Sequence, residues 1–231
     1  MTRRVAVSWS GGKDIAYATY ELMNMDDVDI VTMVTTVNQA NDRSSMHGVR
    51  RSLYERQAGE IGLPIDIVEL PPEPSNEVYE EVMAGTYQRL SDRGVNTLVF
   101  GDLHLEDIRA YREEQLADTT LEGWWPVWGR GTSAFVECVI EVGFTPVVTA
   151  VEGSSLEYTF AGRRLDRMFI DELPDGVDPA GEEGEYHTFV TDGPIFENPV
   201  EVTRGRIVSR PVGETRMHYR DLIDVAHQTP D

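Results

Sequence analysis

Lysine and cysteine are almost absent from this chain of 231 residues. The single cysteine, Cys138, excludes an internal disulfide framework and is compatible with a reducing compartment. Its simplest interpretation is a small apolar residue on a buried helix face. The sequence also has no run near the ~18 consecutive apolar residues that a membrane span requires. Together these absences predict a cytoplasmic protein that does not span a membrane.

Positive charge is also scarce, because 41 acidic residues face 20 basic ones and the formal net charge is −21. A surface of this sign repels nucleic acid phosphates, so DNA and RNA are not expected partners. Arginine supplies every basic residue except Lys13. Few lysines beside an acidic excess are typical of adaptation to high intracellular salt, or of a base composition that favours arginine. Either pressure would remove an indifferent lysine, so Lys13 indicates a need for a compact ammonium group.

Strand and helix patterns alternate over the first hundred residues. Strands are predicted at residues 4–9, 30–37, 65–70 and 95–100, and helices at 14–25, 48–61 and about 75–93. This alternation predicts an α/β fold with a doubly wound parallel sheet. Ligands of such sheets bind beyond the carboxyl ends of the strands. Ser10, Asn38 and Asp102 fall at or just after that edge, and His47 lies in the loop after the second strand.

The pattern is less regular in the second half. It predicts helices at residues 106–117 and 132–142, strands at 145–151 and 185–191, and a hairpin within 200–211 that turns at Arg204-Gly205. The expected organisation is a first domain at residues 1–125, a smaller α+β domain at 126–225, and a tail at 226–231. Trp124, Trp125 and Trp128 stand at the boundary. They are interpreted as domain-interface core, with the lining of a ligand pocket as the alternative.

A phosphate-binding loop is predicted at Ser10-Gly11-Gly12-Lys13-Asp14, between the first strand and the first helix. The two glycines allow the backbone to approach an anion, and the helix presents its partial positive charge to the same point. Ser10 adds a hydroxyl donor and Lys13 a full charge. Asp14 suits the site as a helix cap or as a magnesium ligand. The spacing differs from that of the Walker loop.

The same five residues resemble the PP-loop of ATP pyrophosphatases, in the adenine nucleotide alpha-hydrolase-like group. Those enzymes split ATP between the α- and β-phosphates and transfer AMP to a substrate oxygen. Further runs resemble the diphthine–ammonia ligase family over about residues 5–199: residues 46–50, Gly101-Asp102, 107–112, 126–128, Gly143-Phe144 and 178–189. The run Gly-Glu-Glu-Gly-Glu-Tyr-His-Thr at 181–188 is the most specific. Ile15 departs from the usual serine of the PP-loop, and Ala180 from a cysteine common in the family.

The resemblance implies ATP-dependent amidation, in which the carboxylate of diphthine on elongation factor 2 is adenylated and ammonia then displaces AMP. ATP, Mg²⁺ and ammonium are the implied cofactor and substrates. On this resemblance, residues 1–125 would form the ATP-binding domain and residues 126–225 the acceptor-substrate domain, and a tryptophan-lined pocket would hold adenine or the target histidine. The expected nucleotide-binding residues are Ser10, Gly11, Gly12, Lys13, Asp14, His47, Gly101 and Asp102, with Asp14 also the candidate Mg²⁺ ligand. The expected catalytic residues are Lys13, Arg109, Arg112, Glu182 and Glu185. Cations are needed because the reaction brings together a carboxylate and an α-phosphate.

Several alternatives stay open on the sequence. Arg109 and Arg112 also fit a solvated, salt-bridged helix face, and His187 a structural histidine. The adenylating chemistry could serve another small acceptor, or the chain could be a nucleotide sensor without turnover. A sensor needs no second acidic cluster, so Glu182 and Glu185 favour an enzyme. Homo-oligomerisation is left open.

Overall fold

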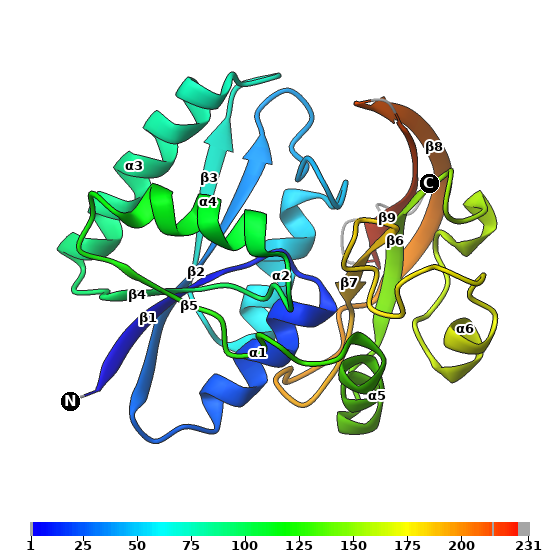
Figure 1. Ribbon diagram of the computed structural model, residues 1–231, viewed down its shortest axis with the longest axis horizontal. Coiled ribbons are helices and arrows are strands. Elements are labelled where there is room, and N and C mark those ends of the chain that lie inside the picture. Colours follow the sequence, from blue (N-terminus) through cyan, green and yellow to red (C-terminus); the bar gives the residue numbers. More distant parts are fainter. Residues whose placement is uncertain (1, 214, 226–231) are drawn as a thin grey trace.

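The computed structural model describes residues 2–213 and 215–225, so the predicted tail at 226–231 lies outside the described residues. Figure 1 shows two sheets side by side. The first is all-parallel, with the strand order β3-β2-β1-β4-β5. Its strands are β1 (Arg3–Ser8), β2 (Val28–Asn38), β3 (Ile65–Leu70), β4 (Thr97–Val99) and β5 (Glu122–Trp124). The predicted doubly wound parallel sheet is confirmed.

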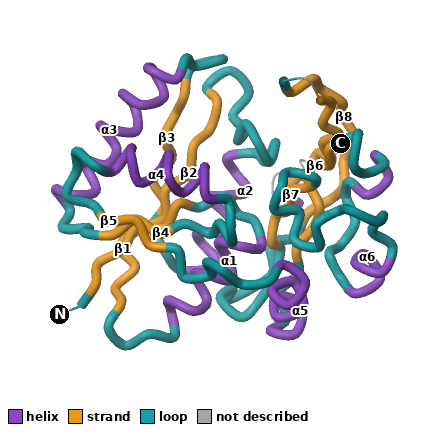
Figure 2. The backbone as a smooth tube through the Cα atoms, in the orientation of Figure 1, coloured by secondary structure: helices purple, strands orange, loops and turns teal. Residues whose placement is uncertain are grey.

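Helices cover both faces of this sheet (Figure 2). They are α1 (Lys13–Met23) and α2 (Arg51–Ile61) on one face, and α3 (Asn76–Asp92) and α4 (Glu106–Leu116) on the other. The alternation along β1 produces this division, since successive strand side chains point to opposite faces. Val5 and Val7 pack with α1 and α2, whereas Ala6 packs with α3.

The second sheet is antiparallel, with the strand order β7-β6-β9-β8. Its strands are β6 (Pro146–Glu152), β7 (Tyr186–Val190), β8 (Val202–Val212) and β9 (Thr215–Asp224). They are accompanied by α5 (Thr132–Val142), α6 (Arg167–Asp171) and a short 3₁₀ turn, η1 (Tyr158–Phe160). The predicted smaller α+β part is therefore confirmed, while the boundary after residue 125 stays a prediction.

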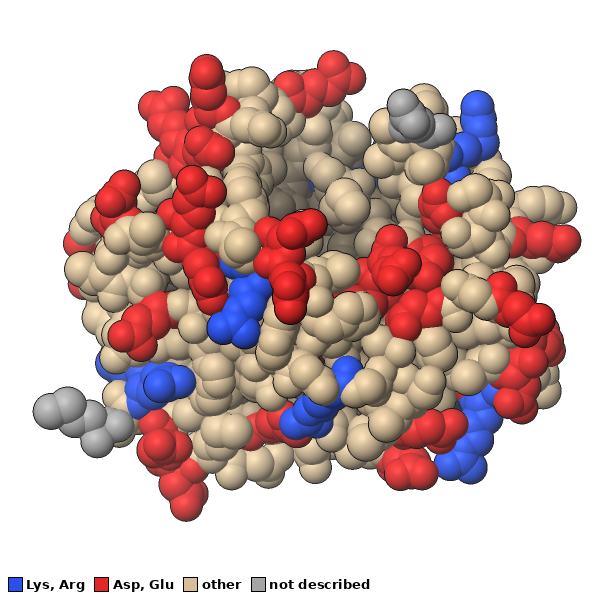
Figure 3. All heavy atoms as spheres, viewed as in Figure 1, with Lys and Arg blue, Asp and Glu red and all other residues tan. Residues whose placement is uncertain are grey.

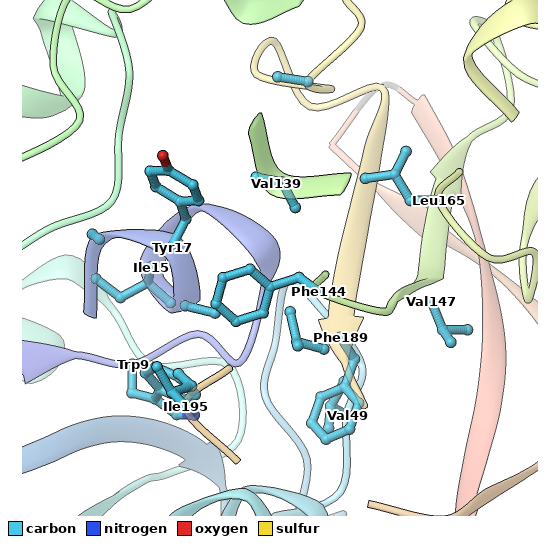
Figure 4. Packing of buried hydrophobic residues seen from close by; sticks show 14 of the residues in the cluster. Trp9, Ile15, Tyr17, Val49, Val139, Phe144, Val147, Leu165, Phe189 and Ile195 are labelled. Carbon is cyan, nitrogen blue, oxygen red and sulfur yellow. The ribbon is translucent and has the colours of Figure 1, made fainter. Parts of the chain in front are cut away.

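One apolar core joins the two sheets. Phe144, just before β6, points toward α1 (Figure 4), and its ring lies 6.4 Å from that of Tyr17 and 6.2 Å from that of Tyr20. On α2, the ring of Tyr54 lies 6.3 Å from that of Phe189 on β7. Because helices of the first sheet and strands of the second share this core, β7 is held against the start of α1.

The predicted turn at Arg204-Gly205 is wrong, because β8 runs through both residues and pairs with β9 on either side of them. The register shifts between Arg204 and Ile207, and a Cβ on Gly205 would lie 3.2 Å from the Cβ of Asp221. The glycine therefore marks an irregularity in a long strand where the backbones come close.

Two further boundaries differ from expectation. Helix α2 begins at Arg51 and not at Gly48, because Gly48 has a left-handed φ of 66° and lies against the ring of Tyr219. The three residues of β5 were not predicted as a strand, since only pairing with β4 identifies them. No helix within residues 2–213 and 215–225 is both long and apolar enough to cross a membrane.

Candidate active site

A cavity of about 420 Å³ lies at the carboxyl ends of β1, β2 and β4 and extends to the start of β7. This volume is within the usual range for small-molecule sites, ~300–1,000 Å³. Figure 3 shows the molecule hollowed between its two parts. The predicted site residues that line the cavity are Ser10, Lys13, Asp14, His47, Gly101, Asp102, Arg112 and Glu182. The fold thus brings residues from four distant segments to one wall.

The phosphate loop, residues 10–14, is fastened to the second sheet by its backbone. Gly11 has a left-handed φ of 72°, and its carbonyl accepts a hydrogen bond from the Val190 N–H at 2.8 Å. The Lys13 N–H donates to Oγ1 of Thr188 at 3.0 Å. Gly11 and Gly12 are outside the cavity lining. Side chains there would meet other atoms, since a Cβ on Gly12 would lie 3.2 Å from the Thr188 carbonyl oxygen.

A buried amide that sequence reasoning missed completes this attachment. Gln57 has no exposed surface, and its Nε2 donates to the carbonyls of Gly11 at 3.1 Å and Val190 at 2.7 Å. Its Oε1 accepts from Nε1 of Trp9 at 2.8 Å. Carbonyls only accept and an indole N–H only donates, so one amide orientation satisfies all three partners. The available signal was a glutamine on the apolar face of α2, beside Tyr54 and Ala58.

Lys13 is held inside the protein and not on its surface. It is 3% exposed, and its Nζ lies 2.9 Å from Oδ1 of Asp14 and 5.4 Å from the ring centre of Tyr186. Burial raises the pKa of Asp14, a shift that Lys13 opposes and Asp102 reinforces. The ammonium therefore sits at the first turn of α1, where the helix adds its own partial positive charge. This is a setting for an anionic ligand.

Three carboxylates share the cavity with this ammonium. Glu182 Oε1 accepts from the Leu103 N–H at 2.6 Å, and burial together with the negative charges of Asp14 and Asp102 raises the pKa of Glu182. Asp102 accepts from Arg112 at 3.2 Å and from Nε1 of Trp125 at 3.1 Å. Within the described part of the chain, no three His, Cys, Asp or Glu side chains are grouped to hold a metal ion.

Two histidine rings stack beside the phosphate loop, with the centres of His47 and His187 4.7 Å apart and Cε1 of His47 3.4 Å from the position of a Cβ on Gly12. Burial lowers the pKa of His47 to about 4, outweighing the hydrogen bond to the Thr188 carbonyl, with Lys13 adding to the lowering. Burial, His47 and Lys13 hold the pKa of His187 well below its ordinary value. Both rings are neutral at pH 7. Nδ1 of His47 carries its proton, since it lies 3.2 Å from a carbonyl that can only accept.

The pKa of His47 makes a prediction for stability against pH. The ordinary pKa of 6.5 applies to the unfolded chain, so between pH 6.5 and about 4 the unfolded state binds more protons. The free energy of unfolding should therefore fall as the pH is lowered through that window. Asp14 and Glu182 oppose this trend, because their folded pKa values are raised. Urea unfolding of His47→Asn should show a flatter fall than wild type, and an unchanged slope would contradict the assignment.

Two predicted catalytic residues lie outside the cavity lining. Arg109 pairs with Glu113 at 2.8 Å, and its guanidinium lies over the rings of Trp125 and Trp128 at 4.7 and 4.8 Å. Glu185 is 7% exposed, and its Oε1 accepts from the Asp178 N–H at 2.8 Å, which closes the loop before β7. A direct catalytic role for either residue stays a prediction. Arg112, one helical turn from Arg109, does face the cavity.

The tryptophans of the boundary region pack against other side chains, and so do Ile15 and Ala180, the two residues that differ from the usual family pattern. Trp125 stacks on Phe100 with ring centres 5.0 Å apart, and none of the three tryptophans from the boundary region lines the cavity. Ile15 is 2% exposed and touches the cavity, so the wall there is apolar where relatives have a hydroxyl. Ala180 is fully buried in the main core. Cys138 is partly buried on α5 and packs against the same core.

This parallel sheet, with a Gly-Gly-Lys loop opening its first helix, has the α/β arrangement that the resemblance to the adenine nucleotide alpha-hydrolase-like group implies. The chain matches the family model described as "Diphthamide synthase N-terminal domain" over residues 3–118 and that described as "Diphthamide synthase C-terminal domain" over 131–218. The protein therefore belongs to the diphthamide synthase family, which is the family of diphthine–ammonia ligase-like, ATP-utilising enzymes. A search of curated proteins found no significant match.

Proposed function

We propose that this protein is an ATP-dependent amide ligase that adenylates the carboxylate of diphthine on elongation factor 2 and amidates it with ammonia. The supporting observation is that the phosphate loop and residues 181–188 form walls of one cavity. The hydrogen bond between Lys13 and Thr188 joins these segments directly. A site for two anionic reactants needs both halves at one place, because the acceptor oxygen must reach the α-phosphate.

The nucleotide half follows from charge and polarity. The hydroxyl of Ser10, the Lys13 ammonium and the first turn of α1 are suited to the phosphates of ATP. The apolar part of the cavity, lined by Val34, Met83, Leu105 and Ile108, is suited to the base. Asp14 fits magnesium, since this ion is commonly bound through one or two carboxylates plus substrate phosphates. When bound, Mg²⁺ would neutralise charge on the phosphates.

The proposed reaction consists of two displacements. In the first, the carboxylate oxygen bonds to the α-phosphorus, the bond to the bridging oxygen of the β-phosphate breaks, and pyrophosphate leaves. In the second, ammonia bonds to the acyl carbon, the acyl–oxygen bond breaks, and AMP leaves while the nitrogen loses a proton. Glu182 suits the role of proton acceptor for two reasons. Its side chain lines the cavity, and its raised pKa lies closer to neutral pH than that of an ordinary glutamate, which makes it a better base. The neutral Nε2 of His47 suits the role of a hydrogen-bond acceptor for the incoming ammonia, since the pKa of about 4 disfavours proton uptake by this ring.

The proposal predicts a stoichiometric product balance. Incubation with Mg²⁺-ATP, ammonium and diphthine-bearing elongation factor 2 should yield one AMP and one pyrophosphate per amide formed, with the amide read by intact-protein mass spectrometry. The unmodified factor is the matched control. AMP and pyrophosphate formed only with some other carboxylate would indicate a different acceptor. Nucleotide binding without either product, whatever the acceptor, would support the sensor interpretation.

A further inference from the structure

The β8–β9 hairpin holds a concentration of positive charge that the site does not use. Between positions 202 and 224 the sequence has five arginines and three acidic residues, against 20 basic and 41 acidic residues in the whole chain. In Figure 3, basic atoms lie at the upper right, at the β8–β9 end, and acidic side chains outnumber the basic ones over this face as a whole. This is a local reversal of the protein's charge.

Four of these arginines have no hydrogen-bonding or ion-pair partner for their side chains among the described residues. Arg204, Arg206, Arg210 and Arg216 are exposed, and their side chains form no hydrogen bond or ion pair with any residue in 2–213 or 215–225. Most of the remaining arginines are paired with carboxylates, as Arg130 is with Glu21 at 2.6 Å. In a chain with a twofold acidic excess, arginines that have no carboxylate partner among the described residues can meet a carboxylate from another protein.

The hairpin is attached to the loop that forms one wall of the cavity. Asp221 on β9 accepts from Arg43 and from Arg50, each at 2.7 Å. Gly48, between those two arginines, lies against the ring of Tyr219 on β9. Met46 and His47 of the same loop line the cavity. The hairpin is therefore fixed beside the cavity and not on a remote surface.

We propose that Arg204, Arg206, Arg210 and Arg216 dock an acidic surface of the protein that carries the acceptor carboxylate. This inference rests on the proposed function. A cavity of about 420 Å³ is the size of a small-molecule site, so the body of an acceptor protein must lie outside it. The hairpin is the basic surface next to that position.

Protection of a sheet edge and binding of nucleic acid are two roles that fit these arginines less well. A charged edge strand resists sheet-to-sheet aggregation, but acidic residues serve that purpose equally, and this chain favours them elsewhere. A nucleic acid strand carries closely spaced negative charge along its length, so it would also meet the acidic surface around the hairpin. A folded protein with a local acidic patch can touch the hairpin alone.

The test is a binding measurement with diphthine-bearing elongation factor 2. In Arg206→Glu/Arg210→Glu, we expect the association rate to fall about tenfold or more at low salt, because steering charges act mainly on this rate. The difference from wild type should shrink as salt rises. The affinity for ATP should be unchanged. Arg89→Glu/Arg164→Glu is the charge-matched control and should bind the factor like wild type. It also replaces two exposed arginines, and in the described residues these bond to threonine hydroxyls and not to carboxylates.

Each outcome decides the inference. Equal association rates for the double variant and wild type would overturn it, and so would the absence of any binding of the factor by wild type. Binding of single-stranded RNA, or self-association, that alone is lost in the double variant would also overturn it and assign the arginines to that partner. If wild type binds the factor through these arginines but forms no amide, the docking surface stands and the proposed function fails.

Discussion

Lys13→Met is expected to lower kcat/KM for pyrophosphate release by about 10²–10³, the loss of about 3–4 kcal/mol that follows removal of one preorganised electrostatic group. Methionine keeps the buried aliphatic volume of a side chain that is 3% exposed, so the change isolates the charge. Without the ammonium, Asp14 loses its partner at 2.9 Å and faces Glu182 and Asp102 alone. Its pKa should rise further, which weakens any magnesium held there.

Lys13→Arg separates charge from shape. The chain uses arginine at every other basic position, yet the space around Lys13 is enclosed by Asp14 and the ring of Tyr186. The larger planar guanidinium should not fit, so activity should also be lost although the charge is kept. For Lys13→Met, Arg89→Ala is the charge-matched control, because it also removes one positive charge, and it should retain wild-type turnover. Lys13→Met with more than a tenth of wild-type kcat/KM, measured with saturating acceptor, would contradict the assignment.

Gln57→Leu is expected to destabilise the fold by roughly 2–6 kcal/mol. It leaves the carbonyl of Val190 and the indole N–H of Trp9 buried without partners, each at a cost of about 1–3 kcal/mol, while the Gly11 carbonyl keeps the Val190 N–H as its donor. For a chain of this size the melting temperature should fall by roughly 5–20 °C. Gln88→Leu, which removes an exposed amide bonded to Asp92 on α3, should change it little.

Gln57→Glu gives a pH signature that a packing defect would not produce. A carboxylate at this position would face two carbonyl acceptors, whereas its protonated form can donate to one of them. Burial and the carbonyls should raise its folded pKa above the unfolded value of ~4.3, so the contribution to stability is present at low pH and lost as the pH rises. Relative to wild type, the variant should therefore recover stability on acidification. A deficit independent of pH would rule out this hydrogen-bonding role.

The sequence by itself determined the elements whose cause is local. Apolar periodicity over the first hundred residues identified β1 to β4 and α1 to α3, because each of these segments must bury one face. The order strand, Gly-Gly, Lys, helix also located the phosphate loop, since a helix start after such a turn presents its N–H groups wherever it occurs. The hairpin predicted within residues 200–211 was wrong, because residues 202–212 form the single strand β8 and its partner β9 follows at 215–224. The error arose because glycine at a strand irregularity and glycine in a turn look alike in sequence.

Only the tertiary structure decided what those elements meet. Lys13 and Thr188 are 175 positions apart, and their hydrogen bond exists because one core packs α1 against β7. Gln57 became a partner of the phosphate loop through the same packing, although its sequence context shows only a polar residue on an apolar helix face. Arg109 and Arg112 lie three positions apart on α4. Arg109 nevertheless stacks on the rings of Trp125 and Trp128, whereas Arg112 pairs with Asp102. Such outcomes depend on side chains supplied by distant segments, and no local pattern encodes them.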